Sequence, residues 1–119
     1  MTQPTLLHEQ DAELRMEGGE CVRIYANTGK IVFSVASLPA GQEGALDPGH
    51  QDAHEIAYLI KGRVVLEFPN STPRWIELRA GDAVLIPEGA PHKVINTGEE
   101  MALISWSLAP HLGRERLTP

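Results

Sequence analysis

One stretch decides the fold class of this 119-residue chain. It reads Gly81-Asp82-Ala83-Val84-Leu85-Ile86-Pro87-Glu88-Gly89-Ala90-Pro91-His92-Lys93-Val94-Ile95-Asn96. An apolar run ends at a Pro/Gly turn, and the next run opens with a histidine. Because side chains alternate between the two faces of a strand, His92, Val94 and Asn96 are expected on one face. The stretch therefore predicts two short strands joined by a tight turn, with a histidine beside it.

The same pattern of short strands and turns continues from this stretch toward both ends of the chain. Short runs rich in apolar and β-branched residues alternate with turns; they cover residues 22–25, 31–35, 56–60, 64–68, 75–78 and 101–108. No segment carries a long helical period, and turns recur about every eight to twelve residues. The pattern predicts an all-β sandwich or barrel. A long irregular loop before His50, His54 and Glu55 interrupts it, and a loop of that length in a small domain usually carries function.

Length and composition indicate one compact domain. At 13.0 kDa and 42% hydrophobic residues, the chain can bury a core without disulfide staples. We expect an N-terminal arm at residues 1–19, a barrel at 20–110 and a polar C-terminal tail at 111–119. The lone Cys21 suits a reducing compartment, so a cytoplasmic location is expected.

Charge and hydropathy exclude several partners. The net charge of −6 and the pI near 5.3 have the wrong sign for binding phosphates, which argues against nucleic acid. No apolar stretch approaches the ~20 residues needed to cross a bilayer, so no membrane association is expected. A small molecule is the expected ligand.

Two groups of residues resemble the motifs of the cupin superfamily. Gly81, Pro87, Gly89, His92 and Asn96 match the second cupin motif, Gly-x5-Pro-x-Gly-x2-His-x3-Asn, at every position. The first motif is kept in part, because Glu55 and Gly62 bracket six residues as in the family, and His50 occupies its second histidine position. The first histidine position holds Pro48 when counted back from Glu55, whereas the count forward from Gly41 reaches Asp47. The resemblance implies a small single-domain cupin, an antiparallel β-barrel of jelly-roll type.

The resemblance also implies a metal site. Carried over residue by residue, the ligands are His50, Glu55 and His92, a set of two imidazoles and one carboxylate that would suit one divalent Fe, Mn, Ni, Zn or Co ion. If the loop is shifted by one place, His54 or Asp47 fills the vacant position. On a regular strand His54 would point away from its neighbour Glu55. The alternative is that these side chains make only polar contacts at the mouth of a barrel without metal.

Function follows from that site as an expectation. A metal-dependent enzyme acting on a small organic molecule is favoured, of the dioxygenase, isomerase, lyase or cyclase type, with no catalytic residue assigned. The alternative is a non-catalytic cupin that binds a sugar or metabolite as a sensor or accessory module. The N-terminal arm and the exposed strand edges predict a homodimer.

Overall fold

The computed structural model describes residues 3–110, and within them nine strands account for the regular structure apart from one 3-10 turn at Glu9–Asp11. The strands are β1 (Glu13–Glu17), β2 (Glu20–Asn27), β3 (Val32–Leu38), β4 (His54–Lys61), β5 (Arg63–Glu67), β6 (Trp75–Arg79), β7 (Ala83–Ile86), β8 (Lys93–Asn96) and β9 (Ala102–Ala109). The strands from β2 to β9 fall where the alternation of β-rich runs and turns predicts them, whereas β1 lies in the segment expected as an arm.

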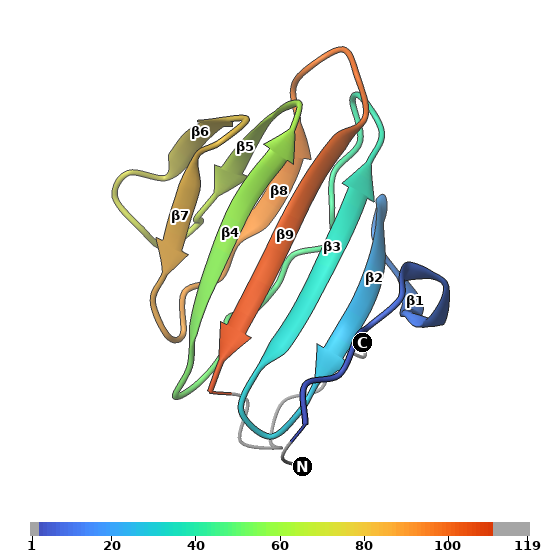
Figure 1. The fold of residues 1–119 in the computed structure, drawn as a ribbon. Coiled ribbons are helices and arrows are strands. Elements are labelled where there is room, and N and C mark those ends of the chain that lie inside the picture. The colour runs from blue at the N-terminus through green and yellow to red at the C-terminus, as the bar shows by residue number, and fades with distance from the viewer. Residues whose placement is uncertain (1–2, 111–119) are drawn as a thin grey trace.

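The strands form two antiparallel sheets that face each other (Figure 1). The larger sheet has the order β1-β2-β3-β9-β4-β7, and the smaller one has the order β6-β5-β8. The chain crosses between the sheets at β4–β5, β6–β7, β7–β8 and β8–β9, so that neighbours in space come from distant parts of the sequence. The predicted all-β, jelly-roll architecture is confirmed.

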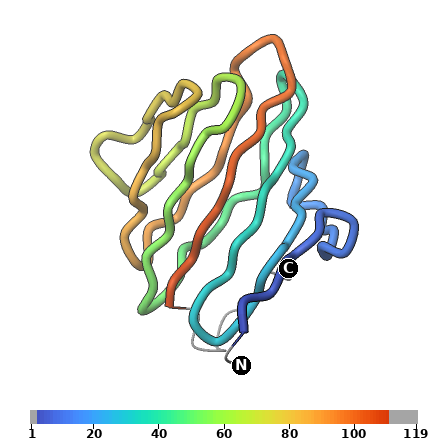
Figure 2. The backbone as a smooth tube through the Cα atoms, viewed as in Figure 1, coloured from blue at the N-terminus to red at the C-terminus, as the bar shows by residue number. Residues whose placement is uncertain are grey.

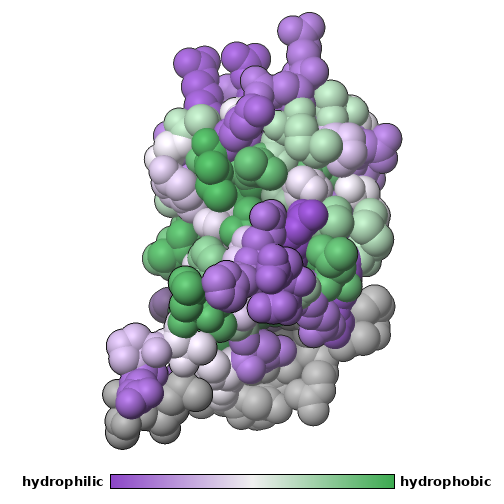
Figure 3. Space-filling view, turned by 45° about the vertical axis from the view of Figure 1, so that its right-hand side comes forward, coloured by the Kyte–Doolittle hydropathy of each residue, from purple (hydrophilic) through white to green (hydrophobic). Residues whose placement is uncertain are grey.

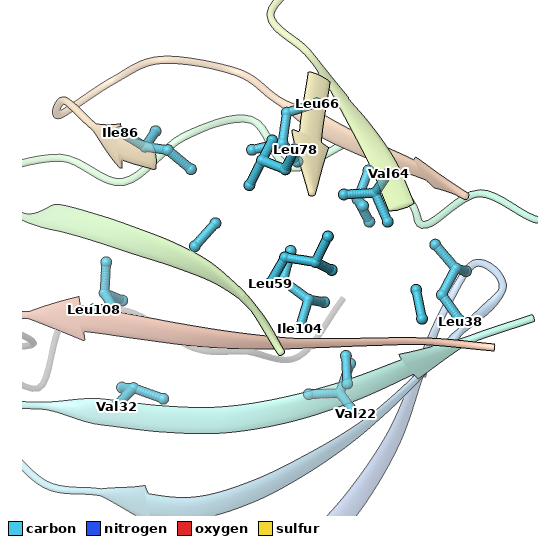
Figure 4. Close-up of a cluster of buried hydrophobic side chains, with 14 of the residues drawn as sticks. Val22, Val32, Leu38, Leu59, Val64, Leu66, Leu78, Ile86, Ile104 and Leu108 are labelled. Atoms are coloured by element: carbon cyan, nitrogen blue, oxygen red, sulfur yellow. The ribbon is translucent and has the colours of Figure 1, made fainter. Parts of the chain in front are cut away.

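The core fills the space between the two sheets (Figure 4). Leu59 and Ile104 project from the larger sheet toward Leu66 and Leu78 of the smaller one, and all four are at most 1% exposed. In β3 and β4, buried and more exposed positions alternate along the strand, as the two-residue period of a strand requires. One face of each sheet therefore packs against the core.

Part of the segment expected as an N-terminal arm belongs to the larger sheet. Residues 13–17 form the edge strand β1, paired with β2 from Glu13 opposite Ile24 to Glu17 opposite Glu20. The hairpin tip is attached to the loop after β3, because Gly19 N donates to Glu43 O at 2.8 Å. Figure 3, which brings this side of the molecule forward, shows apolar patches separated by charged and polar side chains. The expected tail, residues 111–119, lies outside the described residues.

The long connection between β3 and β4 crosses behind the larger sheet, from the end of β3 to the start of β4 (Figure 2). Three isolated bridges hold it: Gly18–Gly44, Glu43–Ile95 and Asp47–His92. The loop is therefore ordered by backbone pairing with segments far away in the sequence. Within residues 3–110, no helix has the length and apolar character that a membrane crossing requires.

Candidate metal centre

Four potential metal ligands converge on the inner side of the larger sheet. Glu55 is the second residue of β4 and faces inward at 6% exposure, because the alternation of that strand points Glu55, Ala57 and Leu59 toward the core. His92 immediately precedes β8 and is 2% exposed. Asp47 and His50 come from the long loop. A β-strand, a turn and a loop thus each contribute to one cluster.

The loop is held against the turn that precedes His92. Asp47 and His92 exchange backbone hydrogen bonds, and Gly89 N donates to His50 O at 2.9 Å. Gly49 lies between them with φ +97°, and a Cβ on this residue would lie 2.7 Å from the carbonyl carbon of Gly89. Only glycine allows this approach, since a side chain would collide with backbone and the φ value is unfavourable for other residues. Gly49 therefore lets the loop deliver Asp47 and His50 to the site.

The ligand-type atoms of Asp47, His50 and Glu55 all lie within 4.8 Å of one another, and His92 Nε2 lies beside both carboxylates. Asp47 Oδ2 lies 3.1 Å from His50 Nε2 and 3.7 Å from His92 Nε2. Glu55 Oε1 lies 3.7 Å from His50 Nε2 and 3.1 Å from His92 Nε2. Ligand atoms that sit about 2.0–2.2 Å from a common ion are roughly 3–4 Å apart. Each carboxylate thus stands between the two imidazoles at coordination spacing.

Hydrogen bonds orient two of these groups. The Nδ1 of His92 donates to the carbonyl oxygen of Ala90 at 2.9 Å, which leaves the Nε2 lone pair of a neutral ring directed at Glu55 and Asp47. Asp47 Oδ1 accepts from Gly49 N at 2.8 Å, so Oδ2 is the oxygen left facing the histidines. The His92 ring also contacts the rings of Phe68 and Trp106, whose centroids are 6.1 and 5.7 Å away. The side chains are held with their ligand atoms turned inward.

Electrostatics favours a positive charge at the centre of the cluster. Burial disfavours a charged His92, but the contact with Glu55 and the charge of Asp47 outweigh burial and raise the pKa of His92. Burial likewise opposes ionisation of Asp47, yet the hydrogen bond with His50 and the nearby imidazoles lower the pKa of Asp47. The raised pKa of His92 and the lowered pKa of Asp47 have the same cause: the cluster stabilises a positive charge near its carboxylates. That charge can be a proton on an imidazole or a metal ion.

One atom tests whether a metal fits. Glu55 Oε1 is buried and accepts no hydrogen bond from any described residue. An ionised oxygen buried without a donor is costly, and the His92 ring can donate to it only when Nε2 carries a proton, since the neutral ring presents a lone pair there. A divalent ion between Glu55, His92, Asp47 and His50 would remove that cost, and imidazole and carboxylate are ligands that Fe, Mn, Ni, Zn and Co accept. The donor set present fits a transition metal.

The structure brings together His50, Glu55 and His92, together with one of the two alternatives for the vacant position. Asp47, which directly precedes Pro48, is the alternative that joins the cluster. The ligand-type atoms of Asp47, His50 and Glu55 all lie within 4.8 Å of one another. His54 is exposed on the opposite face of β4, as strand alternation requires, and takes no part. The path of the loop decides between the two.

The last residue of the second motif has a different role. Asn96 is 1% exposed and donates from Nδ2 to Leu38 O at 2.8 Å and to Glu100 O at 2.9 Å, while its Oδ1 accepts from Gly98 N at 2.8 Å. It ties the end of β8 to the end of β3 and to the following turn. Asn96 thus stabilises β8, the strand that follows His92 directly.

The cluster opens into a cavity of about 430 Å³ between the sheets. Apolar side chains such as Val22, Val32 and Leu108 form part of its wall, and Glu20 and Trp106 form another part. This volume suits one small organic molecule. Sequence reasoning missed Glu20, although an acid two residues before Val22 and four before Ile24, at the inward period of a strand, is the signal that could have found it.

Comparison with known proteins assigns the family. Residues 34–107 match the family Cupin_2, described as a cupin domain, and the chain belongs to it. A glucose-6-phosphate isomerase of Thermococcus onnurineus is 33% identical over 74% of this chain and 54% of that protein. The chain thus spans about half the length of this curated relative.

Solved structures agree on the fold. A double-stranded β-helix protein of unknown function from Klebsiella pneumoniae superposes with a TM-score of 0.75 at 21% identity, covering 92% of each chain. A cupin-superfamily sugar phosphate isomerase from Silicibacter pomeroyi gives a TM-score of 0.73 at 16% identity, covering 88% of this chain and 75% of that one. At these identities the likeness shows the cupin fold alone.

Proposed function

We propose that this protein is a metal-dependent cupin enzyme that acts on a small, oxygen-containing organic molecule. One divalent transition metal would be held by Asp47, His50, Glu55 and His92, and the substrate would occupy the cavity beside them. The observation that carries the proposal is the buried Glu55 Oε1, which accepts no hydrogen bond from the described residues while His92 is neutral and lies 3.1 Å from the Nε2 atom of His92. A metal bound there would act as a Lewis acid on a substrate oxygen.

The chain's own residues prepare the site for that role. Ala90 O fixes the tautomer of His92, and Gly49 N fixes which oxygen of Asp47 faces inward. The apolar wall of the cavity limits water around the reacting groups. Several curated relatives are named glucose-6-phosphate isomerases, which favours the isomerase type among the four reaction types considered.

The alternative function is a non-catalytic cupin that binds a sugar or metabolite. The observation in its favour is Pro48, which stands where the family's first motif has a ligand histidine. A binding protein of that kind needs the cavity but no metal. The two functions therefore differ in whether ligand binding depends on metal.

The first experiment measures metal. Protein purified without a histidine tag, then dialysed against Fe(II), Mn, Ni, Co or Zn, should retain about one equivalent of ion. His92→Ala should retain none while keeping the β-rich circular dichroism spectrum. Wild-type protein that holds less than about a tenth of an equivalent of every ion would contradict the metal site.

The second experiment separates enzyme from binding protein. Glucose 6-phosphate, taken as a probe from the name of the relatives, is added to metal-loaded and to chelator-stripped protein, and the melting temperature is measured. The enzyme proposal expects a rise only with metal, and interconversion of glucose 6-phosphate and fructose 6-phosphate. An equal rise in both forms would favour the binding protein.

The proposal also covers the ligand, the oligomeric state and the cellular location of the protein. Cys21, the single cysteine, supports a reducing, cytoplasmic setting. The net charge of −6 supports a small-molecule ligand rather than nucleic acid. We also propose a homodimer, because β4 and β7 expose Ile56, Tyr58, Ile60 and Leu85 on the outer face of the larger sheet.

A further inference from the structure

An acidic residue that the metal cluster does not use is buried in the same cavity. Glu20 begins β2, and its inward position is set by the alternation that also buries Val22 and Ile24. It is 6% exposed and lines the cavity. Burying a carboxyl group costs free energy unless it is well paired, so folding alone would favour an apolar residue here. A carboxyl kept at such a position points to function.

The surroundings of Glu20 are shaped to hold it. Trp106 Nε1 donates to Glu20 Oε2 at 3.0 Å, and this is the one side-chain hydrogen bond that Glu20 makes within residues 3–110. On the other side, a Cβ on Gly44 would lie 2.5 Å from Oε1, so the glycine leaves the room that this oxygen occupies. Oε2 of Glu20 is thus held by Trp106. Oε1 has no hydrogen-bond partner among the described residues and forms part of the cavity wall.

Glu20 stands next to the metal cluster without being part of it. The ring of Trp106, which holds Glu20, has its centroid 5.7 Å from that of His92. Burial raises the pKa of Glu20 to about 7, against the hydrogen bond from Trp106 and the charge of His92, which lower it; the charges of Glu17 on β1 and Glu55 on β4 raise it further. A carboxyl group in this state can both accept and donate a proton near neutral pH.

We propose that Glu20 is a catalytic residue, which exchanges a proton with a hydroxyl group of the substrate while the substrate's other oxygens face the cluster of Asp47, His50, Glu55 and His92. In this step the substrate O–H bond breaks, its electron pair stays on the substrate oxygen, and the carboxylate of Glu20 becomes a carboxylic acid. At the end of the reaction the carboxylic acid of Glu20 gives this proton to an oxygen of the product, which restores the carboxylate, and Glu20 is neither oxidised nor reduced. The substrate class is a small molecule with a hydroxyl beside a carbonyl. This inference rests on the proposed function.

The test uses acetohydroxamic acid, which carries a carbonyl oxygen beside an acidic O–H and binds metals as an anion. Calorimetric titration of metal-loaded protein in buffers of different ionisation enthalpy counts the protons released on binding. At pH 8 the wild type should release close to none, because ionised Glu20 takes up the proton, and Glu20→Gln should release about one. At a pH low enough to protonate Glu20 in the metal-loaded protein, both proteins should release about one.

Controls keep the result interpretable. Metal content and circular dichroism show whether Glu20→Gln is intact, and Glu77→Gln makes the same change at an exposed position of β6 and should behave as the wild type. Trp106→Phe removes the donor that favours the ionised form, so its proton uptake should begin at a higher pH than in the wild type. This second variant tests the proposal if Glu20→Gln does not fold.

The outcomes are distinct. Equal proton release by wild type and Glu20→Gln at pH 8, with acetohydroxamate bound to both, would overturn the role of Glu20 and leave the proposed function standing. Metal-loaded wild type that binds no acetohydroxamate would contradict the proposed function itself. Proton uptake that is present in the wild type and in Glu77→Gln but lost in Glu20→Gln supports the proposal.

Discussion

Asp47 and His92 pair across an isolated antiparallel bridge: Asp47 N donates to His92 O at 2.8 Å, and His92 N donates to Asp47 O at 2.9 Å. Two backbone hydrogen bonds therefore lock a loop residue to the histidine of the second motif. The same geometry brings Asp47 Oδ2 to 3.7 Å from His92 Nε2. A carboxylate takes the place that the family's motif gives to a histidine.

Replacing Asp47 by Asn should weaken metal binding with little effect on the loop. The amide oxygen can still accept the hydrogen bond from Gly49 N, but the negative charge facing His50 and His92 is lost. We expect the dissociation constant of the metal, measured by competition with a chelator, to rise at least about tenfold. The matched control is His54→Ala, which removes an exposed imidazole a few residues away and should leave the constant unchanged. The opposite ranking of the two variants would contradict the cluster described above.

Metal affinity should fall as the pH is lowered through the raised pKa of His92. In the metal-free protein that pKa lies above the ordinary value of 6.5, because the contact with Glu55 and the charge of Asp47 outweigh burial. A proton on Nε2 competes with the ion, so each pH unit below this pKa should cost about tenfold in affinity for one displaced proton. Chelator competition between pH 8 and pH 5.5 measures this. An affinity that stays constant down to pH 5.5 would show that His92 is not a ligand.

The buried Glu20 should make the metal-free protein less stable as the pH rises from 4.5 to about 7. The sign follows from its pKa, which burial raises from 4.5 to about 7, so that in this window the folded state holds a proton that the unfolded state has lost. Above the folded-state pKa of Glu20, its contribution to the free energy of unfolding no longer changes with pH. By then ionised Glu20 has lowered the free energy of unfolding by about 3 kcal/mol. Glu20→Gln lacks this penalty, so its free energy of unfolding relative to the wild type should increase between pH 4.5 and pH 8.

Urea unfolding at several pH values tests the effect of Glu20. Glu77→Gln, an exposed acid-to-amide change, is the control and should follow the wild-type curve. Parallel curves for Glu20→Gln and the wild type would mean that Glu20 has an ordinary pKa in the folded protein.

The outer face of the larger sheet should carry the proposed dimer interface. Ile56 pairs with Leu85 across β4 and β7, and the two side chains are 45% and 62% exposed. Light scattering at micromolar concentration should give twice the 13.0 kDa of the chain for the wild type and 13.0 kDa for Ile56→Asp. Leu14→Asp places the same charge on the outer side of β1; dissociation by this variant alone would move the interface to the N-terminal strand. A wild-type mass of 13.0 kDa would contradict the dimer.

The local pattern of the sequence determined the strands from β2 to β9, the turns and the inward direction of Glu55 and His92. Strand alternation has a period of two residues, so the burial of Glu55, Ala57 and Leu59 on β4 can be read from neighbouring positions. The spacing of Gly81, Pro87, Gly89, His92 and Asn96 likewise describes one turn between two strands. These features depend on residues close in the chain, and the cupin architecture was predictable from them.

Tertiary structure alone decided the fourth member of the cluster and the surroundings of Glu20. The choice of Asp47 over His54 depends on the path of the loop, which is set by hydrogen bonds to His92, forty-five positions further along the chain. Glu20 meets Trp106 across 86 positions, because β2 and β9 lie on either side of β3 in one sheet. An irregular loop has no period from which to read side-chain direction, and pairing between distant strands is fixed by the packing of the whole sheet. Local sequence therefore specifies which residues can be ligands, and the long-range backbone pairing specifies which of them meet.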